Sequence, residues 1–346
     1  MLDTQIIKIE DINNPQNEMQ KIKAAADILK NGGLVCIPTE TVYGLAANAL
    51  DKSAVANIFK AKGRPQDNPL IVHISDIDML AELASAVPKS AARLAESFWP
   101  GPLTIILPKS DIIPDVTSAG MQTVAVRMPS NKIACEIISA AGLPLAAPSA
   151  NLSGSPSPTS AKHCVDDMLG RVDAIVDGGE CLFGLESTVV SLAGEKPRLL
   201  RPGAVTLEQL KEVLGKVEVD NAVLNKMAEN EQAASPGMKY KHYAPKAKVV
   251  IIKSTLEKYA DFVNRQGDVW AMCFDGEQAK LNKPYVTYGH KSNPSEQANR
   301  LFEVLRSLDE KGAKLVYARC PDTNGIGLAV YNRLLRAAAF EIINLQ

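Results

Sequence analysis

Apolar positions alternate between helical and strand spacing over the first two thirds of the chain. From residue 19 to 30 apolar side chains recur every three or four positions and stop before Gly32-Gly33, which predicts a helix. The short apolar run 34–37 then predicts a buried strand. Further helices are predicted over 53–59, 77–86, 89–98, 132–141 and 206–214, and strands over 70–74, 103–107, 123–129 and 174–179. This first domain is expected to end near Gly215.

A second alternation follows a polar, weakly patterned stretch over residues 217–234. Strands are predicted over 249–252, 269–274 and 314–318, and helices over 256–264, 294–308 and 328–340. Strands separated by helices are typical of a small parallel α/β domain. The expected organisation is therefore a first domain over 1–215, a linker over 216–246 and a second domain over 247–346.

The linker contains more aromatic and ionisable side chains than a connection between domains usually has. Residues 235–246 include Tyr240, His242 and Tyr243 together with three lysines. Interdomain linkers are usually exposed and variable in composition, whereas segments that close over a ligand carry functional side chains. We predict that this segment acts as a lid.

Composition limits the classes of protein that the chain can represent. With 346 residues, a net charge of −1 and 22% charged residues, the chain is expected to be a two-domain globular protein without a broad nucleic-acid-binding surface. The six cysteines are scattered without metal-site spacing, which indicates reduced core residues. No apolar run has the length of a membrane span, and the N-terminus lacks the pattern of a signal peptide. A cytoplasmic location is expected.

Cations and prolines gather where the helix over 53–59 ends. Gly63 and Pro65 are helix-ending residues, so Lys62 and Arg64 are expected on a turn that points toward a ligand. His73 lies in the strand that follows. A solvated charge cluster at a helix end is the alternative interpretation.

Other polar groups occur at predicted strand ends, where ligands collect in α/β proteins. The segment 39–43 offers two hydroxyls, a carboxylate and a phenol, or else a turn with a helix cap. Arg127 is either an edge residue facing water or an anion ligand. The loop 149–159 is rich in hydroxyls and prolines, which favours a stiff polar pocket over a flexible linker. Ser187 adds a hydroxyl at the start of a further strand, and Arg201 adds a cation before a turn.

Several familiar chemistries are excluded by missing motifs. The chain has neither a P-loop nor the Rossmann glycine fingerprint, and its four histidines are far apart without a zinc-protease spacing. What remains is a set of cations among hydroxyl-rich strand ends, which suits a polyanionic ligand and nucleotidyl transfer in particular. From the residues alone, the protein is a binder of a phosphorylated, hydroxyl-bearing small ligand.

The motifs resemble a known family. Lys62-Gly63-Arg64 together with Ser149-Ala150-Asn151 looks like the KxR…SxN signature of the YrdC-type family, and residues 38–45, 99–104 and 147–151 resemble it as well. The lid-like segment and the trailing α/β domain resemble the longer, two-domain members, the L-threonylcarbamoyladenylate synthases. The resemblance covers essentially the whole chain.

The resemblance implies a fold and a reaction. The first domain would have a twisted mixed sheet with a concave, basic cavity, and the smaller second domain would be Rossmann-like. L-threonine, bicarbonate or CO2 and ATP, with Mg²⁺ carried by ATP and no organic cofactor, would give L-threonylcarbamoyl-AMP and pyrophosphate. The product would feed N6-threonylcarbamoylation of adenosine in certain tRNAs through a separate transferase complex, with no requirement for direct tRNA binding or for a membrane.

The resemblance also implies roles for individual residues. The signature would supply the catalytic set Lys62, Arg64, Ser149 and Asn151. Threonine and its carbamate would lie among Thr41, His73, Arg127, Ser187 and the backbone of Ala147. The nucleotide would lie among Arg64, Asn68, Thr123, Ser149, Ser157 and Arg201, with His242 or Tyr243 added by the linker.

Two alternatives belong to other functional classes. An RNA-binding or ribosome-maturation module could use the same basic cavity, although the near-neutral charge and the lack of aromatic stacking motifs weigh against it. A carbamoyltransferase-like relative would act on carbamoyl phosphate, but such chains usually carry zinc-finger and acylphosphatase-like segments, and the sequence has neither.

Overall fold

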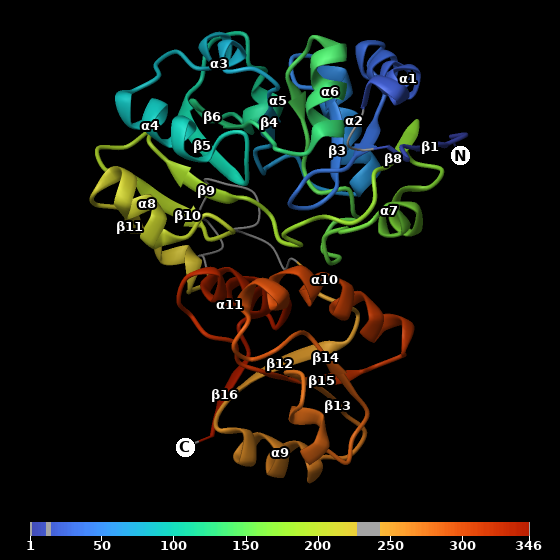
Figure 1. Cartoon of the computed structure of the whole chain (residues 1–346), viewed down its shortest axis with the longest axis vertical. Helices are drawn as coiled ribbons and strands as arrows, with labels where there is room; N and C mark the ends of the chain where they lie inside the picture. The colour runs from blue at the N-terminus through green and yellow to red at the C-terminus, as the bar shows by residue number, and fades with distance from the viewer. Residues whose placement is uncertain (1, 12–14, 227–242, 346) are drawn as a thin grey trace.

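The computed structural model describes residues 2–11, 15–226 and 243–345, and it contains two β-sheets, each with helices on its faces (Figure 1). The larger sheet belongs to the first two thirds of the chain. The smaller sheet lies below it in Figure 1, on the far side of helices α10 and α11. Among the described residues, no helix combines the length and the apolar character needed to cross a membrane.

The larger sheet has eleven strands in the order β1-β8-β2-β3-β7-β4-β6-β5-β9-β10-β11. Parallel pairs such as β4 with β6 occur beside antiparallel pairs such as β5 with β6, so the predicted mixed sheet is confirmed. The strands are β1 (Gln5–Lys8), β2 (Val35–Ile37), β3 (Gly44–Asn48), β4 (Ile71–His73), β5 (Leu103–Pro108), β6 (Thr123–Arg127), β7 (Leu145–Ala146), β8 (Ala174–Asp177), β9 (Thr188–Ser191), β10 (Arg198–Arg201) and β11 (Glu218–Val219).

Helices cover this sheet and bury the apolar stripes that the sequence shows. Ile22, Ala25 and Leu29 of the first helix are fully buried, and their three- to four-residue spacing explains why the segment is a helix. The helices are α1 (Met19–Lys30), α2 (Lys52–Lys62), α3 (Asp78–Leu83), α4 (Lys89–Phe98), α5 (Asp115–Ser118), α6 (Lys132–Ala141), α7 (Ala161–Met168) and α8 (Leu207–Leu214).

The smaller sheet has the order β14-β13-β15-β12-β16, and every pair in it is parallel, as predicted. Helices α10 and α11 cover the face toward the first sheet, and α9 covers the other face (Figure 1). The elements are β12 (Lys248–Lys253), α9 (Leu256–Asn264), β13 (Trp270–Cys273), β14 (Tyr285–Thr287), α10 (Pro294–Glu310), β15 (Leu315–Arg319), α11 (Ile326–Ala337) and β16 (Ile342–Asn344).

Seven strands are absent from the sequence-based prediction, namely β1, β3, β7, β10, β11, β14 and β16. Four of them, β1, β11, β14 and β16, are edge strands, and at most one residue of each is buried: Ile6 and Tyr285, for example, are exposed. Strand β11 pairs with β10, so the first sheet continues beyond the limit predicted at residue 215. The remaining domain limits stay predictions.

Candidate active site

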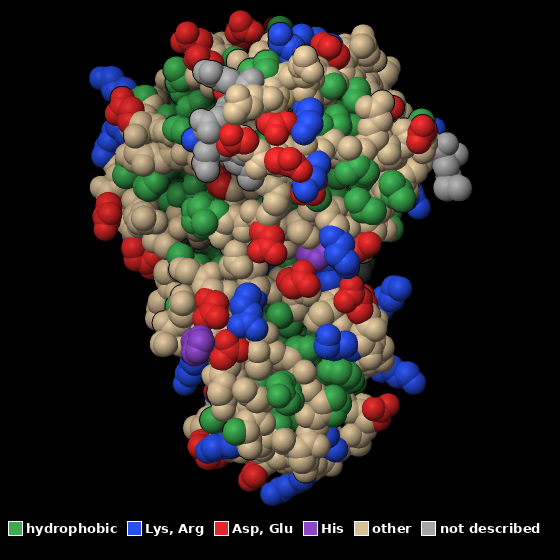
Figure 2. Space-filling view, turned by 45° about the vertical axis from the view of Figure 1, so that its right-hand side comes forward, with side chains coloured by type: hydrophobic (Ala, Val, Ile, Leu, Met, Phe, Trp, Pro, Cys, Tyr) green, Lys and Arg blue, Asp and Glu red, His purple; other side chains and the backbone are tan. Residues whose placement is uncertain are grey.

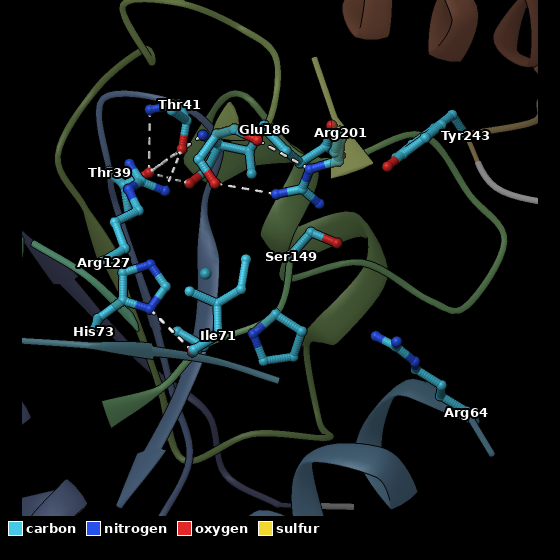
Figure 3. A pocket seen from close by; sticks show the side chains of 15 residues that line it. Thr39, Thr41, Arg64, Ile71, His73, Arg127, Ser149, Glu186, Arg201 and Tyr243 are labelled. Atoms are coloured by element: carbon cyan, nitrogen blue, oxygen red, sulfur yellow. Dashed lines mark hydrogen bonds between the residues drawn. The ribbon is translucent and has the colours of Figure 1, made fainter. Parts of the chain in front are cut away.

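A cavity that is partly open to solvent lies where several strand ends and loops of the first sheet meet Tyr243 (Figure 3). Its empty space, open solvent included, is about 580 Å³. The lining residues are Thr39, Thr41, Val42, Gly44, Arg64, Ile71, His73, Arg127, Ala147, Pro148, Ser149, Glu186, Ser187, Arg201 and Tyr243. Segments up to about 200 residues apart in the sequence thus form one polar, largely cationic site.

Two neighbouring parallel strands place His73 and Arg127 side by side. These residues end β4 and β6 and are register partners across the two strands. Their positions fit the rule that ligands bind at the carboxyl ends of parallel strands. Burial, and then the charge of Arg127, lowers the pKa of His73 to about 3, so the imidazole is neutral at physiological pH. The positive charge of this corner therefore comes from Arg127.

Arg127 is held from three sides. Its guanidinium contacts the Glu40 carboxylate at 2.7 Å, donates to the Thr41 hydroxyl at 2.9 Å and donates to the Gly101 carbonyl at 3.3 Å. Both charged side chains are only 4% exposed. The first alternative for Arg127, a water-facing edge residue, is therefore wrong, and its guanidinium faces the cavity in a fixed orientation.

The Thr39 hydroxyl fixes the conformation of the loop between β2 and β3, which forms part of this corner. Thr39 donates to the Val42 carbonyl at 2.6 Å, and it accepts hydrogen bonds from the Thr41 and Val42 amides. The Thr39 and Thr41 hydroxyls lie 2.9 Å apart. The loop is consequently a polar turn that presents Thr41 to the cavity, rather than a helix cap.

Ser187 and Arg201 form a second corner. Arg201 ends β10 and donates to the Ser187 carbonyl at 3.0 Å and to the Ser187 hydroxyl at 3.1 Å. The Ser187 hydroxyl also lies 2.7 Å from that of Thr104 on β5. Burial is the main cause that lowers the pKa of Arg201. A buried guanidinium and an ordered hydroxyl are therefore available together at this wall.

Arg64 enters the cavity from the end of α2. Asp51 caps the start of this helix, and Gly63 ends it in a left-handed conformation with φ of 61°. The chain then turns, and the Arg64 guanidinium points into the cavity (Figure 3). The predicted turn and the predicted direction of Arg64 are both observed.

Lys62 differs from its prediction. Helix α2 extends through Lys62, so the residue is not on the turn, and it is only 3% exposed. Its ammonium group donates to the Ser149 carbonyl and, at 2.7 Å, to the Asn151 carbonyl. Burial, and secondarily Arg64, lowers the pKa of Lys62 to about 7. Lys62 thus fixes the backbone of the loop that carries Ser149 instead of lining the cavity.

Replacing Lys62 by methionine is expected to lower the free energy of unfolding by about 3 kcal/mol, because two buried carbonyls lose their donor. Urea denaturation at neutral pH measures this change. Lys60→Met is the matched control, since Lys60 lies in the same helical turn but is exposed, and its effect should stay within about 0.5 kcal/mol. Equal stabilities of the two variants would contradict the supporting role.

Asn151 and Ser157 also stabilise the loop after β7. The Asn151 amide donates to the Leu152 and Ser155 carbonyls, both at 2.8 Å. The buried Ser157 hydroxyl donates to a carboxylate oxygen of Glu186. Neither residue is among those that line the cavity, whereas Ala147 and Ser149 of the same loop do line it. The stiff polar loop predicted from its prolines is therefore present, with internal hydrogen bonds as the additional cause.

Three predicted nucleotide residues lie elsewhere or outside the described residues. Thr123 begins β6, at the opposite end of that strand from Arg127, and Asn68 is fully buried just before β4. Neither lines the cavity. Neither polar side-chain atom of Asn68 has a hydrogen-bond partner among the described residues. His242 and most of the predicted lid, residues 235–242, lie outside the described residues, whereas Tyr243 is described and lines the cavity.

Two carboxylates of this site have no role in the family pattern. Glu40 forms an ion pair with the buried Arg127, and Glu186 is the one carboxylate among the described lining residues. Both stand beside residues that the motifs had singled out, Thr41 and Ser187. Their position next to these residues could have indicated a role in the site. Which arginines they pair with follows only from the fold.

Two family models match the chain. One, described as "Telomere recombination", matches residues 27–203, and one described as "Threonylcarbamoyl-AMP synthase, C-terminal domain" matches residues 205–339. The threonylcarbamoyl-AMP synthase of Pyrococcus abyssi is 44% identical over 337 residues, covering 94% of this chain and 96% of its own length. That of Bacillus subtilis is 45% identical over 338 residues, covering 96% and 95%.

Solved structures are similar over the same length. Pyrococcus abyssi Sua5 complexed with L-threonine has a TM-score of 0.90 and 43% identity, covering 99% of this chain and 100% of that one. A variant of the same protein with adjacent His and Tyr residues replaced by Ala has a TM-score of 0.92 and 42% identity, covering 99% and 98%. Escherichia coli YciO, with a TM-score of 0.51 and 28% identity, covers 58% of this chain and 95% of its own.

Proposed function

The chain belongs to the threonylcarbamoyl-AMP synthase family in its two-domain form, and we propose that it makes L-threonylcarbamoyl-AMP and pyrophosphate from L-threonine, bicarbonate or CO2, and ATP. The observation that carries this proposal is the cavity itself, in which the guanidinium groups of Arg64, Arg127 and Arg201 line one space together with several hydroxyls. Such a site favours two anionic reactants at once.

The threonine side of the proposal rests on residues from both corners of the cavity. Thr41, His73, Arg127, Ala147 and Ser187, the five residues that the family pattern assigns to threonine, all line it. Arg127 would pair with a carboxylate, and hydroxyls would bind the threonine side chain. The relative solved with L-threonine supports threonine as the amino acid that this chain uses.

The nucleotide side is supported by Arg64, Ser149, Arg201 and Tyr243, which also line the cavity. Guanidinium groups pair with phosphate oxygens in a bidentate manner, and serine hydroxyls complete the hydrogen bonding. The roles of Asn68, Thr123, Ser157 and His242 in ATP binding remain predictions. For Asn68, a buried amide that has no hydrogen-bond partner in the part of the chain that the structure describes is consistent with a ligand that supplies one.

The proposed chemistry needs positioning rather than a covalent nucleophile. The threonine amine attacks CO2 and loses a proton, which gives a carbamate. A carbamate oxygen then bonds to the α-phosphorus of ATP while the bond from that phosphorus to the bridging oxygen breaks, and pyrophosphate leaves. Arg64 and Arg127 would reduce the repulsion between the two anions. A partly enclosed cavity would also protect the carbamate from water.

Mg²⁺ is proposed to arrive with ATP and to neutralise phosphate charge. Among the described residues that line the cavity, Glu186 is the single carboxylate, and it is already engaged by Ser157 and Arg333. Mg²⁺ commonly keeps its waters and binds through substrate phosphates with few protein ligands. The donor set of this cavity therefore fits a cation held mainly by the nucleotide.

Release of the product completes the proposal. L-threonylcarbamoyl-AMP would pass to a separate tRNA-modifying transferase complex, so the chain itself need not bind tRNA. Charges on the face shown in Figure 2 alternate in sign, without a continuous basic surface, and this pattern gives no support to the RNA-binding alternative. The six cysteines are all free, in keeping with the proposed cytoplasmic location.

Pyrophosphate release is expected only when L-threonine, bicarbonate and ATP–Mg²⁺ are present together. A coupled pyrophosphate assay with each component omitted in turn measures this dependence, and mass spectrometry identifies the adenylate. L-serine serves as the control amino acid. Pyrophosphate formation that proceeds without threonine would contradict the proposal, and salt-sensitive binding to duplex RNA without such activity would favour the alternative.

A further inference from the structure

Arg333 belongs to the second domain, yet its side chain ends at the wall of the cavity. It extends from α11 and is completely buried. Its Nε donates to the Glu186 carboxylate at 2.7 Å, and its Nη2 donates to the Glu186 carbonyl at 3.2 Å. Its Nη1 donates to the Pro202 carbonyl at 2.9 Å. One guanidinium therefore holds two segments of the first domain that are adjacent in sequence to Ser187 and Arg201.

Glu186 connects Arg333 to the cavity. One carboxylate oxygen accepts from Arg333 and the other accepts from Ser157, while the residue itself lines the cavity (Figure 3). Burial raises the pKa of Glu186, but the charges of Arg333 and Arg201 and the hydrogen bond from Ser157 outweigh it, so the pKa lies below its ordinary value. Glu186 is therefore an anion at the edge of a site built for anions.

The charge of Glu186 needs a partner, since it would oppose binding of a phosphorylated ligand. Arg333 supplies a compensating charge at hydrogen-bond distance, from outside the cavity. The Arg333 guanidinium also lies 5.7 Å from the ring centroid of Tyr243, and that ring packs against Phe302 of α10 at 5.2 Å. Arg333 thus interacts with two lining residues of the cavity: it forms an ion pair with Glu186 and lies against the ring of Tyr243.

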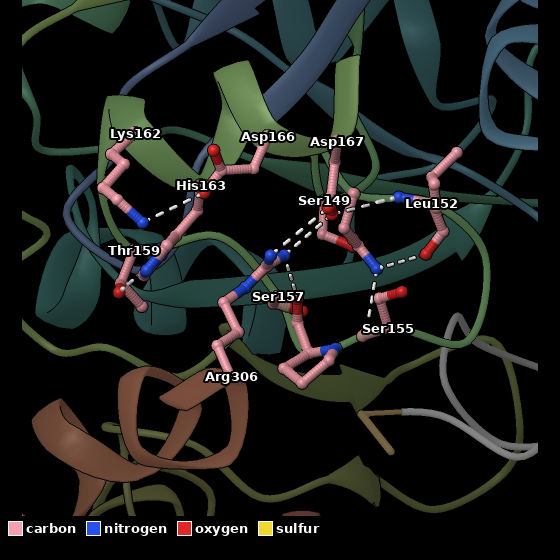
Figure 4. Close-up of polar contacts among 12 residues, drawn as sticks. Ser149, Leu152, Ser155, Ser157, Thr159, Lys162, His163, Asp166, Asp167 and Arg306 are labelled. Atoms are coloured by element: carbon pink, nitrogen blue, oxygen red, sulfur yellow. Dashed lines mark hydrogen bonds and ion pairs between the residues drawn. The ribbon is translucent and has the colours of Figure 1, made fainter. Parts of the chain in front are cut away.

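A second arginine of this domain forms a hydrogen bond with the loop that carries Ser157. Arg306 of α10 donates to the Pro156 carbonyl at 2.6 Å and pairs with Asp167 at 2.8 Å (Figure 4). Pro156 immediately precedes Ser157, the other partner of Glu186. The second domain therefore supplies Arg333, one partner of the Glu186 carboxylate, and holds the backbone next to Ser157, the other partner.

We propose that Arg333 is a positioning residue for nucleotide binding, which orients Glu186 and offsets its charge so that Ser157, Arg201 and Tyr243 are arranged for ATP. This inference rests on the proposed function, and it gives the second domain a part in the site through Glu186 and Tyr243.

The test compares Arg333→Met with Arg319→Met. Arg319 is also a buried arginine of the second domain that pairs with a glutamate, Glu277 at 2.9 Å, but its partners are within that domain. Arg333→Met is expected to raise KM for ATP about tenfold and to change kcat less than about threefold, as for a lost charge contact in binding. Arg319→Met should leave KM for ATP unchanged, and Arg333→Lys should recover part of the loss.

The route through Glu186 is tested with Glu186→Gln and the double variant R333M/E186Q. If Arg333 acts through Glu186, the double variant is expected to bind ATP no more weakly than Glu186→Gln alone, because the uncompensated anion is gone. Fully additive losses would overturn this route. An unchanged KM for ATP in Arg333→Met would overturn the positioning role itself.

Failure of the inference can be distinguished from failure of the proposed function. Wild-type protein and Arg319→Met set the baseline for threonine-dependent pyrophosphate release, and if both lack it, the proposed function fails. Calorimetric titration with ATP then still decides whether Arg333→Met weakens nucleotide binding. If Arg333→Met does not fold, Arg333→Gln, which keeps a hydrogen-bond donor but no charge, replaces it, and wild-type ATP affinity in that single variant would overturn the proposal.

Discussion

Arg64→Ala is expected to reduce threonine-dependent pyrophosphate release at least about a hundredfold while the thermal midpoint stays unchanged. Arg64 follows the left-handed Gly63 at the end of α2, is half-buried, and directs its guanidinium into the cavity. The Arg64 guanidinium lies 6.0 Å from the centroid of the Phe59 ring, a contact worth about 0.5–1 kcal/mol, so its removal should cost the fold little. The activity should fall because the Arg64 guanidinium no longer stabilises the negative charge of the transition state.

Two matched variants sharpen this experiment. Arg64→Lys keeps a cation but loses the planar fork, so its activity is expected to fall between that of wild type and Arg64→Ala. Lys60→Ala removes an exposed cation from the same helix end and should retain full activity. Near wild-type activity in Arg64→Ala, or equal losses in Arg64→Ala and Lys60→Ala, would contradict a role for Arg64 in charge stabilisation.

The part of the site that could be predicted follows from local signals. A glycine and a proline after a helical run place Arg64 on a turn, and two short apolar strands that end in His73 and Arg127 place both at a sheet edge. These inferences need only the spacing of neighbouring residues. The same holds for the buried strands at the centre of each sheet, whose continuous apolar runs are visible in the sequence.

Lys62 shows where local signals fail. The sequence places it one residue before Gly63, and nothing nearby indicates that its ammonium group is buried. Its acceptors are the carbonyls of Ser149 and Asn151, which lie 87 and 89 residues further along the chain. The two halves of the KxR…SxN signature are therefore in contact. Lys62 and Asn151 stabilise the loop, whereas Arg64 and Ser149 line the cavity.

The role of Arg333 could not be predicted either, because its partner is even more distant in the sequence. Its helix has the amphipathic pattern of an ordinary surface helix, and an arginine there predicts solvent contact. Its partner Glu186 lies 147 residues away, in the other domain. The short strands β14 and β16 escaped prediction because edge strands bury one side only, so that propensity and apolar pattern are both weak.

Arg127→Met is expected to have a large effect on both stability and activity, and the two effects can be separated. Glu40 and Arg127 form an ion pair at 2.7 Å with both side chains 4% exposed, so removal of the cation leaves a buried carboxylate uncompensated. The free energy of unfolding should fall by about 3–5 kcal/mol. Activity should fall about a thousandfold, because the cavity loses the cation proposed to bind threonine and its carbamate.

The double variant E40Q/R127M separates the two contributions. It removes both buried charges, so urea denaturation is expected to show that much of the lost stability returns. Threonine binding, measured by calorimetry, and pyrophosphate release should nevertheless remain as low as in Arg127→Met, since the cation that faces the cavity is still absent. Recovery of activity together with stability would show that Arg127 only supports the fold. A double variant as unstable as Arg127→Met would instead assign the stability loss to the hydrogen bonds with Thr41 and Gly101.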